Sequence, residues 1–374
     1  MLRSLIRSIA LSAVIAPATI GAAHAGGLEA NGYNWDLLFD PGTYVGKGTV
    51  TRVIIDHDIT SLAAPGLGTV ATSSNRTYYN FAAKADLIDN ASCLVSAQNP
   101  WGSGTDRLLP YAAATGQSVR ERITSNDLGL TCAYGFAVGP GSLSIIGGVS
   151  AQSLDYEALV PALLPGPTLG TLPVELDGNG FGWRIGAAYE VPEIALRVSA
   201  IYNAAIDYDL SGTFSAGLPA AASVTTPQTF EVKAQSGIAP GWLVLGGIKW
   251  VDWSAVDALT VTTPGPTLTT VLNYEDGWTV SAGVGHQLTE DLTVLAGLTW
   301  DRGTSRENGA GVLANGTQSD RWGANLGAAY KPSENFELSG GVSYSMIESG
   351  TNALGETWDT GSVLAFSFSA KASF

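Results

Sequence analysis

The C-terminal segment 361–374 alternates between two kinds of side chain, and this alternation limits the chain to a small set of folds. One set of alternate positions is mainly apolar and the other is mostly small or polar; the first set is Ser362, Leu364, Phe366, Phe368, Ala370, Ala372 and Phe374. A period of two belongs to a β-strand and not to a helix. In the wall of a transmembrane barrel, the apolar face meets lipid and the polar face meets the lumen.

The same alternation recurs along the chain between short turns. Turns are predicted near residues 89–90, 139–141, 192, 240–241, 290–291 and 333–334. Each interval has room for an outgoing strand, a longer loop and a returning strand, which is the outer-membrane pattern. Six such turns join seven strand pairs, so we expect fourteen strands, at 43–58, 75–88, 91–99, 118–137, 142–157, 176–191, 193–213, 225–238, 241–261, 270–289, 291–303, 318–331, 334–348 and 361–374.

Beyond its N-terminal segment, the sequence has no apolar run long enough for a membrane helix, which leaves a closed barrel as the way to cross a bilayer. A soluble β-sandwich or propeller would also alternate, but its outer faces would be polar. Aromatic residues instead gather near predicted strand ends, as interfacial girdles require; they are Tyr189, Trp242, Trp278, Trp300, Trp322 and Tyr330. The predicted fold is therefore all-β, a 14-stranded antiparallel transmembrane β-barrel.

The N-terminus has the pattern of a secretory signal peptide. Arg3 and Arg7 precede a short apolar stretch, and Ala23-His24-Ala25 forms a small-x-small cleavage site. We expect residues 1–25 to be the signal peptide, 26–42 a short segment before the first strand, and 43–374 the barrel. An even number of strands would place both termini in the periplasm and the protein in the bacterial outer membrane. The terminal Phe374 is typical of outer-membrane proteins and would be recognised by the barrel-assembly machinery.

Charge and rare residues exclude several functions. The formal net charge of −15 argues against nucleic acid, whose phosphates call for a basic surface. Cys93 and Cys132 fall near the turn-side ends of neighbouring antiparallel strands, so we expect a disulfide, with two free thiols as the alternative. His57 and His286 belong to no recognised catalytic motif. The sequence predicts no enzyme, no cofactor and no metal site.

Several segments, taken in order, carry a resemblance to a known family. They are Gly182–Glu190, Arg197–Tyr202, Tyr208–Phe214, Thr226–Val232, Trp250–Val256 with its Trp-x-x-Trp-Ser pattern, Tyr274–Trp278 and Ala296–Asp301. Together they resemble strands six to eleven of the FadL/OMPP1 (TodX-type) family of outer-membrane transporters. The resemblance covers residues 176–374 well and 43–160 loosely.

The resemblance implies passive transport of long-chain fatty acids or other hydrophobic small molecules. In that family the loops capture the substrate, a site in the barrel binds it, and a kink in the third strand releases it sideways into outer-membrane lipid and lipopolysaccharide. The family's longer hatch with its Asn-Pro-Ala motif is missing here, and no Lys or Arg stands near Tyr156 or Leu272. These departures favour a hydrophobic compound over a fatty acid as the predicted cargo, with a general porin or an adhesin-type structural barrel as alternatives.

Three groups of residues are the candidate sites. Capture is assigned to an apolar loop after the fifth strand and to its partner loop, through Leu159, Val160, Leu163, Leu164, Phe214 and Leu218. Lateral opening is assigned to Pro100, Trp101 and Gly102, where the third strand is interrupted. A short plug inside the lumen would contribute Trp35, Leu38 and Phe39, together with Trp253 from the wall. The alternatives are a loop packed into the barrel mouth, the simple start of a loop, and a disordered tail.

Overall fold

The computed structural model describes residues 27–61, 70–71, 73–165, 168–256, 258–265, 267–305, 313 and 318–374. The predicted signal peptide, 1–25, lies outside these residues. No helix in the described part of the chain is long and apolar enough to cross a membrane.

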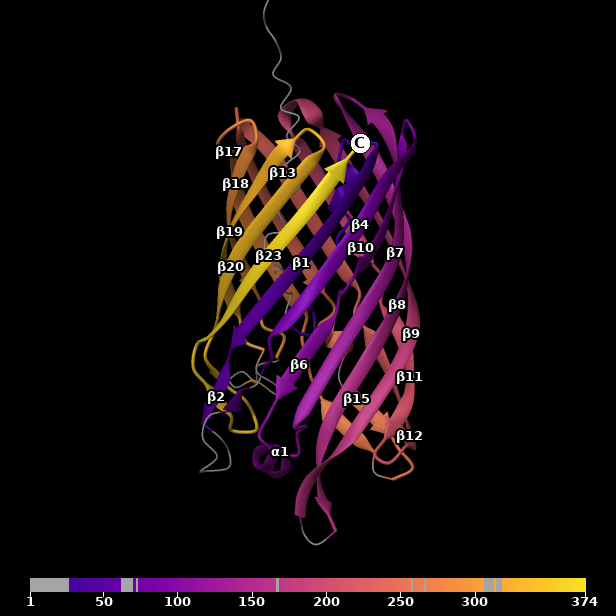
Figure 1. Ribbon diagram of the computed structural model, residues 1–374, viewed down its shortest axis with the longest axis vertical. Helices are drawn as coiled ribbons and strands as arrows, with labels where there is room; N and C mark the ends of the chain where they lie inside the picture. Colours follow the sequence, from indigo (N-terminus) through magenta and orange to yellow (C-terminus); the bar gives the residue numbers. More distant parts are fainter. Residues whose placement is uncertain are drawn as a thin grey trace, which may run out of the picture.

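The described strands form a closed antiparallel barrel with fourteen wall positions, as the alternation predicts. Five of these positions are occupied by two consecutive strands. The wall runs β1 (Tyr44–Asp56), β4 (Arg76–Ile88), β5 (Ala91–Gln98) with β6 (Gly102–Asp106), β7 (Arg120–Val138), β8 (Gly141–Leu164), β9 (Thr168–Val191), β10 (Leu196–Asn203) with β11 (Ile206–Phe214), β12 (Leu218–Thr226) with β13 (Thr229–Ala239), β14 (Trp242–Val251) with β15 (Ala258–Thr262), β16 (Leu268–Val271) with β17 (Gly277–Gln287), β18 (Leu292–Asp301), β19 (Arg321–Ser333), β20 (Phe336–Ile347) and β23 (Gly361–Ser373). The last strand, β23, pairs with β1 and closes the cylinder (Figure 1).

The two ends of the barrel differ in build. The turn end holds Phe374 and the short turns, and the loop end holds α1 (Leu109–Thr115) and the tip of the β8–β9 hairpin (Figure 1). A small sheet also lies at the loop end, formed by β2 (Asp58–Ser61), β3 (Val70–Ala71), β21 (Gly350–Thr351) and β22 (Thr357–Trp358). Short 3-10 turns occur at η1 (Asp36–Phe39), η2 (Pro192–Ile194) and η3 (Trp253–Ala255).

Three predictions about the loop end are wrong. The segment expected to be a capture loop, 159–169, is instead the paired tip of β8 and β9, where Val160 stands opposite Leu172. Its expected partner loop is another hairpin, β11–β12, with its turn at residues 215–217. The chain expected to be a long loop after the third strand forms β6 and α1. The apolar residues at these positions indicated an exposed loop because the strands were expected to end at the membrane surface, whereas they continue beyond it.

The barrel wall changes polarity along its length. In the membrane half, large apolar side chains of β8 and β9 point outward, including Val149, Phe181 and Ile185, while Gln152 and Arg184 are buried inside. Toward the loop end the polarity of the two faces of these strands is reversed. Leu154, Tyr156, Val174 and Leu176 form a buried apolar cluster on the inner face, and Asp155, Glu157, Glu175 and Asp177 occupy the outer face. We call this outer part the projecting half.

The N-terminal segment Gly27–Gly42 lies inside the barrel. Backbone bonds join it to the wall, because Ala30 donates to the carbonyl of Pro100 at 2.9 Å and Gly102 donates to Leu28 at 2.8 Å. Three of its carboxylates meet wall lysines: Glu29 pairs with Lys249, Asp36 with Lys233 and Asp40 with Lys371.

Candidate functional site

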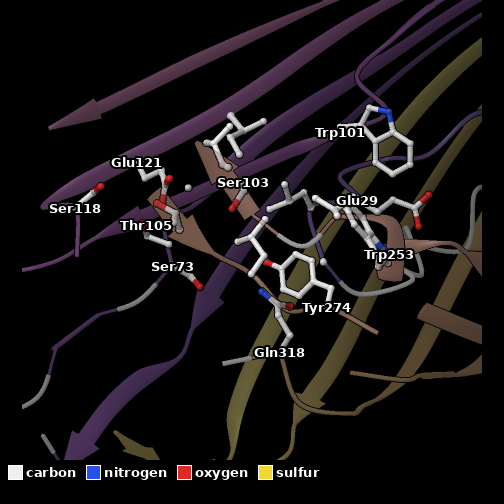
Figure 2. A pocket seen from close by; sticks show the side chains of 18 of the residues that line it. Glu29, Ser73, Trp101, Ser103, Thr105, Ser118, Glu121, Trp253, Tyr274 and Gln318 are labelled. Atoms are coloured by element: carbon white, nitrogen blue, oxygen red, sulfur yellow. The ribbon is translucent and has the colours of Figure 1, made fainter. Parts of the chain in front are cut away.

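A cavity of about 420 Å³ lies in the loop-end part of the lumen, on the loop-end side of the N-terminal segment, and Figure 2 shows side chains that line it. We call it the central pocket. Side chains from the N-terminal segment, from α1's flanks and from most of the wall line it. Its lining combines apolar side chains with polar and charged ones in roughly equal measure, and polar groups in a ligand site can fix the orientation of the ligand.

The deep end of the central pocket is a cluster of three aromatic rings. Trp101 and Trp253 meet edge to face with ring centroids 5.5 Å apart, and Trp253 meets Tyr274 in the same way at 5.7 Å. Figure 2 shows the three rings together with Glu29. The interruption of β5 and β6 supplies Trp101, and the 3-10 turn after β14 supplies Trp253. Such rings present a large apolar surface that is already fixed in place.

Three guanidinium groups also line the central pocket, from Arg76, Arg107 and Arg321. The sequence has no Lys or Arg beside Tyr156 or Leu272, yet both of these residues line the same pocket as the three arginines. The cations come from 76–107 and from the start of β19, segments distant in sequence from both positions.

Carboxylates balance these cations at the pocket's outer end. Tyr156 donates to Glu121 at 2.9 Å, and Gln117 donates to Glu356 at 3.2 Å. Burial raises the pKa of Glu356, which lies in the segment between β21 and β22, and the nearby Arg107 charge opposes this effect. The contact between Gln117 and Glu356 joins the α1 region to the small loop-end sheet across the mouth of the pocket.

A second cavity of about 500 Å³ continues outward from the central pocket; we call it the outer cleft. The two share Tyr156 and Leu259 among their lining residues, so they adjoin. Of the residues assigned to capture, Val160, Leu163 and Phe214 line the outer cleft. The other three, Leu159, Leu164 and Leu218, are not among its lining residues.

The third wall position is divided where Pro100, Trp101 and Gly102 were expected to open it. The strand β5 pairs with both β4 and β7, but β6 has a continuous ladder with β7 only. Side chains close most of the resulting seam between β4 and β6. Tyr79 donates its backbone N–H to Asn99 Oδ1 at 3.1 Å, and the Arg76 guanidinium donates to the Gly102 carbonyl at 3.0 Å.

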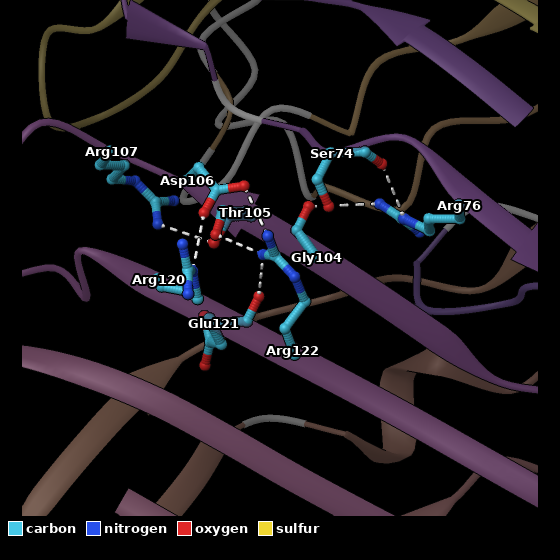
Figure 3. A network of polar contacts seen from close by, with 9 residues as sticks. All are labelled: Ser74, Arg76, Gly104, Thr105, Asp106, Arg107, Arg120, Glu121 and Arg122. Atoms are coloured by element: carbon cyan, nitrogen blue, oxygen red, sulfur yellow. Dashed lines mark hydrogen bonds and ion pairs between the residues drawn. The ribbon is translucent and has the colours of Figure 1, made fainter. Parts of the chain in front are cut away.

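Figure 3 shows the polar contacts around this seam. On the β4 side, Ser74 donates its backbone N–H to the Gly104 carbonyl at 3.2 Å. On the β7 side, Arg122 holds the Asp106 carboxylate at 2.6 Å and Arg120 holds it at 3.2 Å. The β6–β7 edge is thus held by a backbone ladder and ion pairs, whereas the β4–β6 edge is held by a backbone hydrogen bond and a few side-chain contacts.

The structure joins Cys93 and Cys132 by a disulfide between β5 and β7. The two cysteines stand directly opposite each other in the register and alternate with the inward Leu94 and Thr131. The bridge therefore faces outward, on the turn-end side of the seam.

The residues assigned to the plug lie closer to the turn end than the central pocket does. Trp35, Leu38 and Phe39 are buried in the N-terminal segment but line neither the central pocket nor the outer cleft. Lys233 lies over the Trp35 ring at 5.3 Å, and Arg197 lies over the Phe39 ring at 4.5 Å. These contacts fix the segment to the wall. Of the four residues assigned to the plug and lumen, Trp253 alone reaches the central pocket.

Comparison with known proteins agrees with this architecture. Residues 122–374 match the model of the family described as outer membrane protein transport protein (OMPP1/FadL/TodX). The chain belongs to this family. Its closed barrel and this membership place the protein in the outer membrane.

Among curated relatives of this OMPP1/FadL/TodX chain, outer membrane protein P1 of Haemophilus influenzae is 26% identical over 176 residues, covering 44% of this chain and 38% of the relative. The long-chain fatty acid transport protein of Salmonella typhi is 24% identical over 211 residues, covering 49% and 48%. The matched region thus spans less than half of either relative.

Two solved structures share the fold over nearly the whole chain. A Pseudomonas aeruginosa FadL homologue superposes with a TM-score of 0.75 at 17% identity, covering 95% of this chain and 98% of the homologue. The Pseudomonas putida toluene transporter TodX superposes with a TM-score of 0.63 at 15% identity, covering 91% and 92%. At these identities the likeness concerns the fold.

Proposed function

We propose that this barrel carries hydrophobic small molecules across the outer membrane without chemical change. The observation that carries the proposal is the inverted projecting half. Its inner face is apolar and continues through the outer cleft into the central pocket. An aqueous porin would have a polar mouth, whereas this mouth offers a partitioning surface to apolar cargo, at about 25 cal/mol per Å² buried.

The central pocket supports a cargo that is apolar over most of its length and carries an acceptor or acid at one end. The aromatic cluster suits the apolar part. Arg76, Arg107 and Arg321 are the groups that would receive an anionic head. Fatty acids combine both features, as the name of the Salmonella relative suggests, and aromatic hydrocarbons, the cargo named for TodX, would use the rings alone.

The weak β4–β6 seam supports sideways exit into the membrane. It lies beside Trp101, which lines the central pocket, and it is held by Arg76, Asn99 and Ser74 rather than by a backbone ladder. The Cys93–Cys132 disulfide ties the turn-end half of the same wall position, so movement would be confined to β6. The N-terminal segment would act as the plug on the turn-end side of the pocket.

The proposed orientation places the loop end outside the cell and both termini in the periplasm. The outward apolar side chains of the membrane half would contact lipid and lipopolysaccharide. Phe374, which is 74% exposed at the turn end, would be available to the barrel-assembly machinery.

The test is uptake of labelled oleate and of toluene into vesicles that contain the protein, with a hydrophilic sugar as a third solute. A Cβ at Gly104 would lie 2.5 Å from Ser74 Oγ, so a Ser74→Cys/Gly104→Cys pair can lock the seam. The native cysteines are replaced by serine in this background. We expect oxidation to stop apolar uptake and reduction to restore it.

The controls separate the parts of the proposal. The serine background without the new cysteines should transport equally in both redox states. Uptake that survives the locked seam would overturn sideways exit and leave the transport itself intact. Sugar uptake as fast as that of oleate would identify a general porin, and no uptake of any solute would favour a structural role.

A further inference from the structure

Another cavity, lined by charged, hydroxyl and apolar residues, lies beside the N-terminal segment. This side cavity has a volume of about 180 Å³. Its wall side is built from small and hydroxyl residues of β1, β14, β17, β18 and β23, namely Thr49, Thr51, Gly246, Gly247, Thr279, Ser281, Thr299 and Ser367. Small side chains leave the space unfilled, and their hydroxyl groups can replace part of an ion's hydration shell.

The side cavity continues to the turn end. It shares Arg197 and Gln235 with a larger cavity of about 970 Å³ that is lined by Leu38, Asp86 and Glu190 among others. The two cavities therefore adjoin, and together they reach from the middle of the lumen to the turn end. Apolar side chains line parts of this route as well, but its charged groups, which include Asp36, Lys233 and Glu190, are what an inorganic ion would meet.

One ion pair separates the side cavity from the central pocket. Glu29 lines the central pocket, Lys249 lines the side cavity, and the two side chains are in direct contact. Glu29 belongs to the N-terminal segment, and Lys249 belongs to β14 of the wall. A charge pair at a narrow point blocks ions while it is closed and exposes a fixed charge to the path when it is broken.

We propose that the barrel holds a second, axial path for small hydrated inorganic ions, closed at the Glu29–Lys249 pair. This path goes beyond the transport of apolar cargo, because it leaves through the turn end and not through the β4–β6 seam. Lys233, Arg197, Asp36 and Glu231 line it beyond the closure. Loss of either member of the pair leaves the charge of the other at the closure.

Gly32 provides a way to disturb the pair without changing its charges. Its φ is +59°, and an added Cβ would lie 2.7 Å from Glu29 Oε1 and 2.8 Å from Lys249 Nζ. A Gly32→Ala variant must therefore shift one or both side chains. Together with Glu29→Gln and Lys249→Met, it gives three variants that disturb the same ion pair and leave three different net charges there.

The experiment is ionic current through the full chain in planar bilayers, with a KCl gradient to measure selectivity. We expect small currents for the unaltered protein and several-fold larger currents for Glu29→Gln, Lys249→Met and Gly32→Ala. The reversal potential should indicate anion preference for Glu29→Gln, which leaves Lys249, and cation preference for Lys249→Met, which leaves Glu29. Gly32→Ala should show little preference.

Glu157→Gln is the matched control, because it removes one carboxylate from the outward face and should leave the current unchanged. Folding of each variant is checked by formation of the Cys93–Cys132 disulfide and by migration of the unheated barrel. Currents that stay at the unaltered level in all three folded variants would overturn the axial path. So would a shift of reversal potential in the same direction for Glu29→Gln and Lys249→Met. Oleate uptake in the same preparations tests the proposed function separately.

Discussion

Within β8 and β9, the membrane half and the projecting half obey opposite rules of burial. In the membrane half Val149 and Ile185 face outward and Gln152 faces the lumen, whereas in the projecting half Glu157 faces outward and Tyr156 faces inward. The backbone geometry and the pairing register continue without a break from one half to the other. The strand itself therefore does not decide which face is apolar; the medium outside it does.

The comparison explains how one hairpin can serve two purposes. Where lipid lies outside, apolar side chains are stable there, and the lumen can keep charged residues that hold the N-terminal segment. Where water lies outside, the carboxylates of Asp155 and Asp177 are solvated, and apolar side chains turn inward to line the outer cleft. An apolar vestibule thus arises from the same alternation that builds the membrane wall.

The largest expected effect is a charge placed on the outward face of the membrane half. Ile185→Arg should lower the free energy of unfolding in lipid vesicles by about 2–4 kcal/mol, because an arginine there faces hydrocarbon. Asp177→Arg, on the same outward face of β9 in the projecting half, should cost nothing. Urea unfolding in vesicles compares the two, and equal losses would remove the distinction between the halves.

The second prediction concerns pH at the loop end. Burial, and then the nearby Arg321 charge, lower the pKa of His57 from 6.5 to about 4. The unfolded segment binds a proton at higher pH than the folded one, so local stability falls as the pH drops from about 6.5 to 4. The full loss is about 3 kcal/mol.

Hydrogen–deuterium exchange of β2 and β22, corrected for intrinsic rates, measures this loss, since His57 meets the ring of Trp358 edge to face. The barrel strand β18 serves as the internal control and should keep its protection. A His57→Gln variant should flatten the pH dependence. A loop-end profile that is as flat as that of β18 in the unaltered protein would show that His57 does not govern this end.

A third prediction tests whether binding depends on the apolar inner face of the projecting half. Val160→Asp puts a carboxylate into the outer cleft and should weaken binding of a fluorescent fatty acid about tenfold, because apolar area is lost where the chain lies. Leu159→Asp, its outward neighbour in β8, should leave binding unchanged. Equal losses in the two variants would mean that capture does not depend on which face is apolar.

The smallest expected effect comes from the outward acids. Asp155 and Asp177 stand directly opposite each other across β8 and β9, as do Glu157 and Glu175. Asp177→Asn should raise the free energy of unfolding by about 0.2–1 kcal/mol, since like charges opposite each other destabilise a sheet. The gain should shrink in high salt because screening weakens the repulsion. A gain independent of salt would point to another cause.

Much of the barrel could be predicted because its strands follow a local rule. The C-terminal alternation, the turn spacing and the even strand count depend on residues within one strand or one turn, and the closed fourteen-position wall confirms them. The strand tips at 159–169 and 214–222 were misread as loops because their apolar faces were assumed to end with the membrane. The segment that contains β6 and α1 has no clear period, which explains why both elements were missed.

The closure of this chain into a lipid-facing cylinder follows from local sequence, since the period of two and the choice of residues on each face are properties of neighbouring positions. What the cylinder contains depends on contacts between distant segments. Arg76, Arg107 and Arg321 come from separate segments and share one pocket, and Glu29 meets Lys249 across 220 positions of the chain. Such meetings depend on which strands face each other across the lumen, and closure of the barrel sets that geometry.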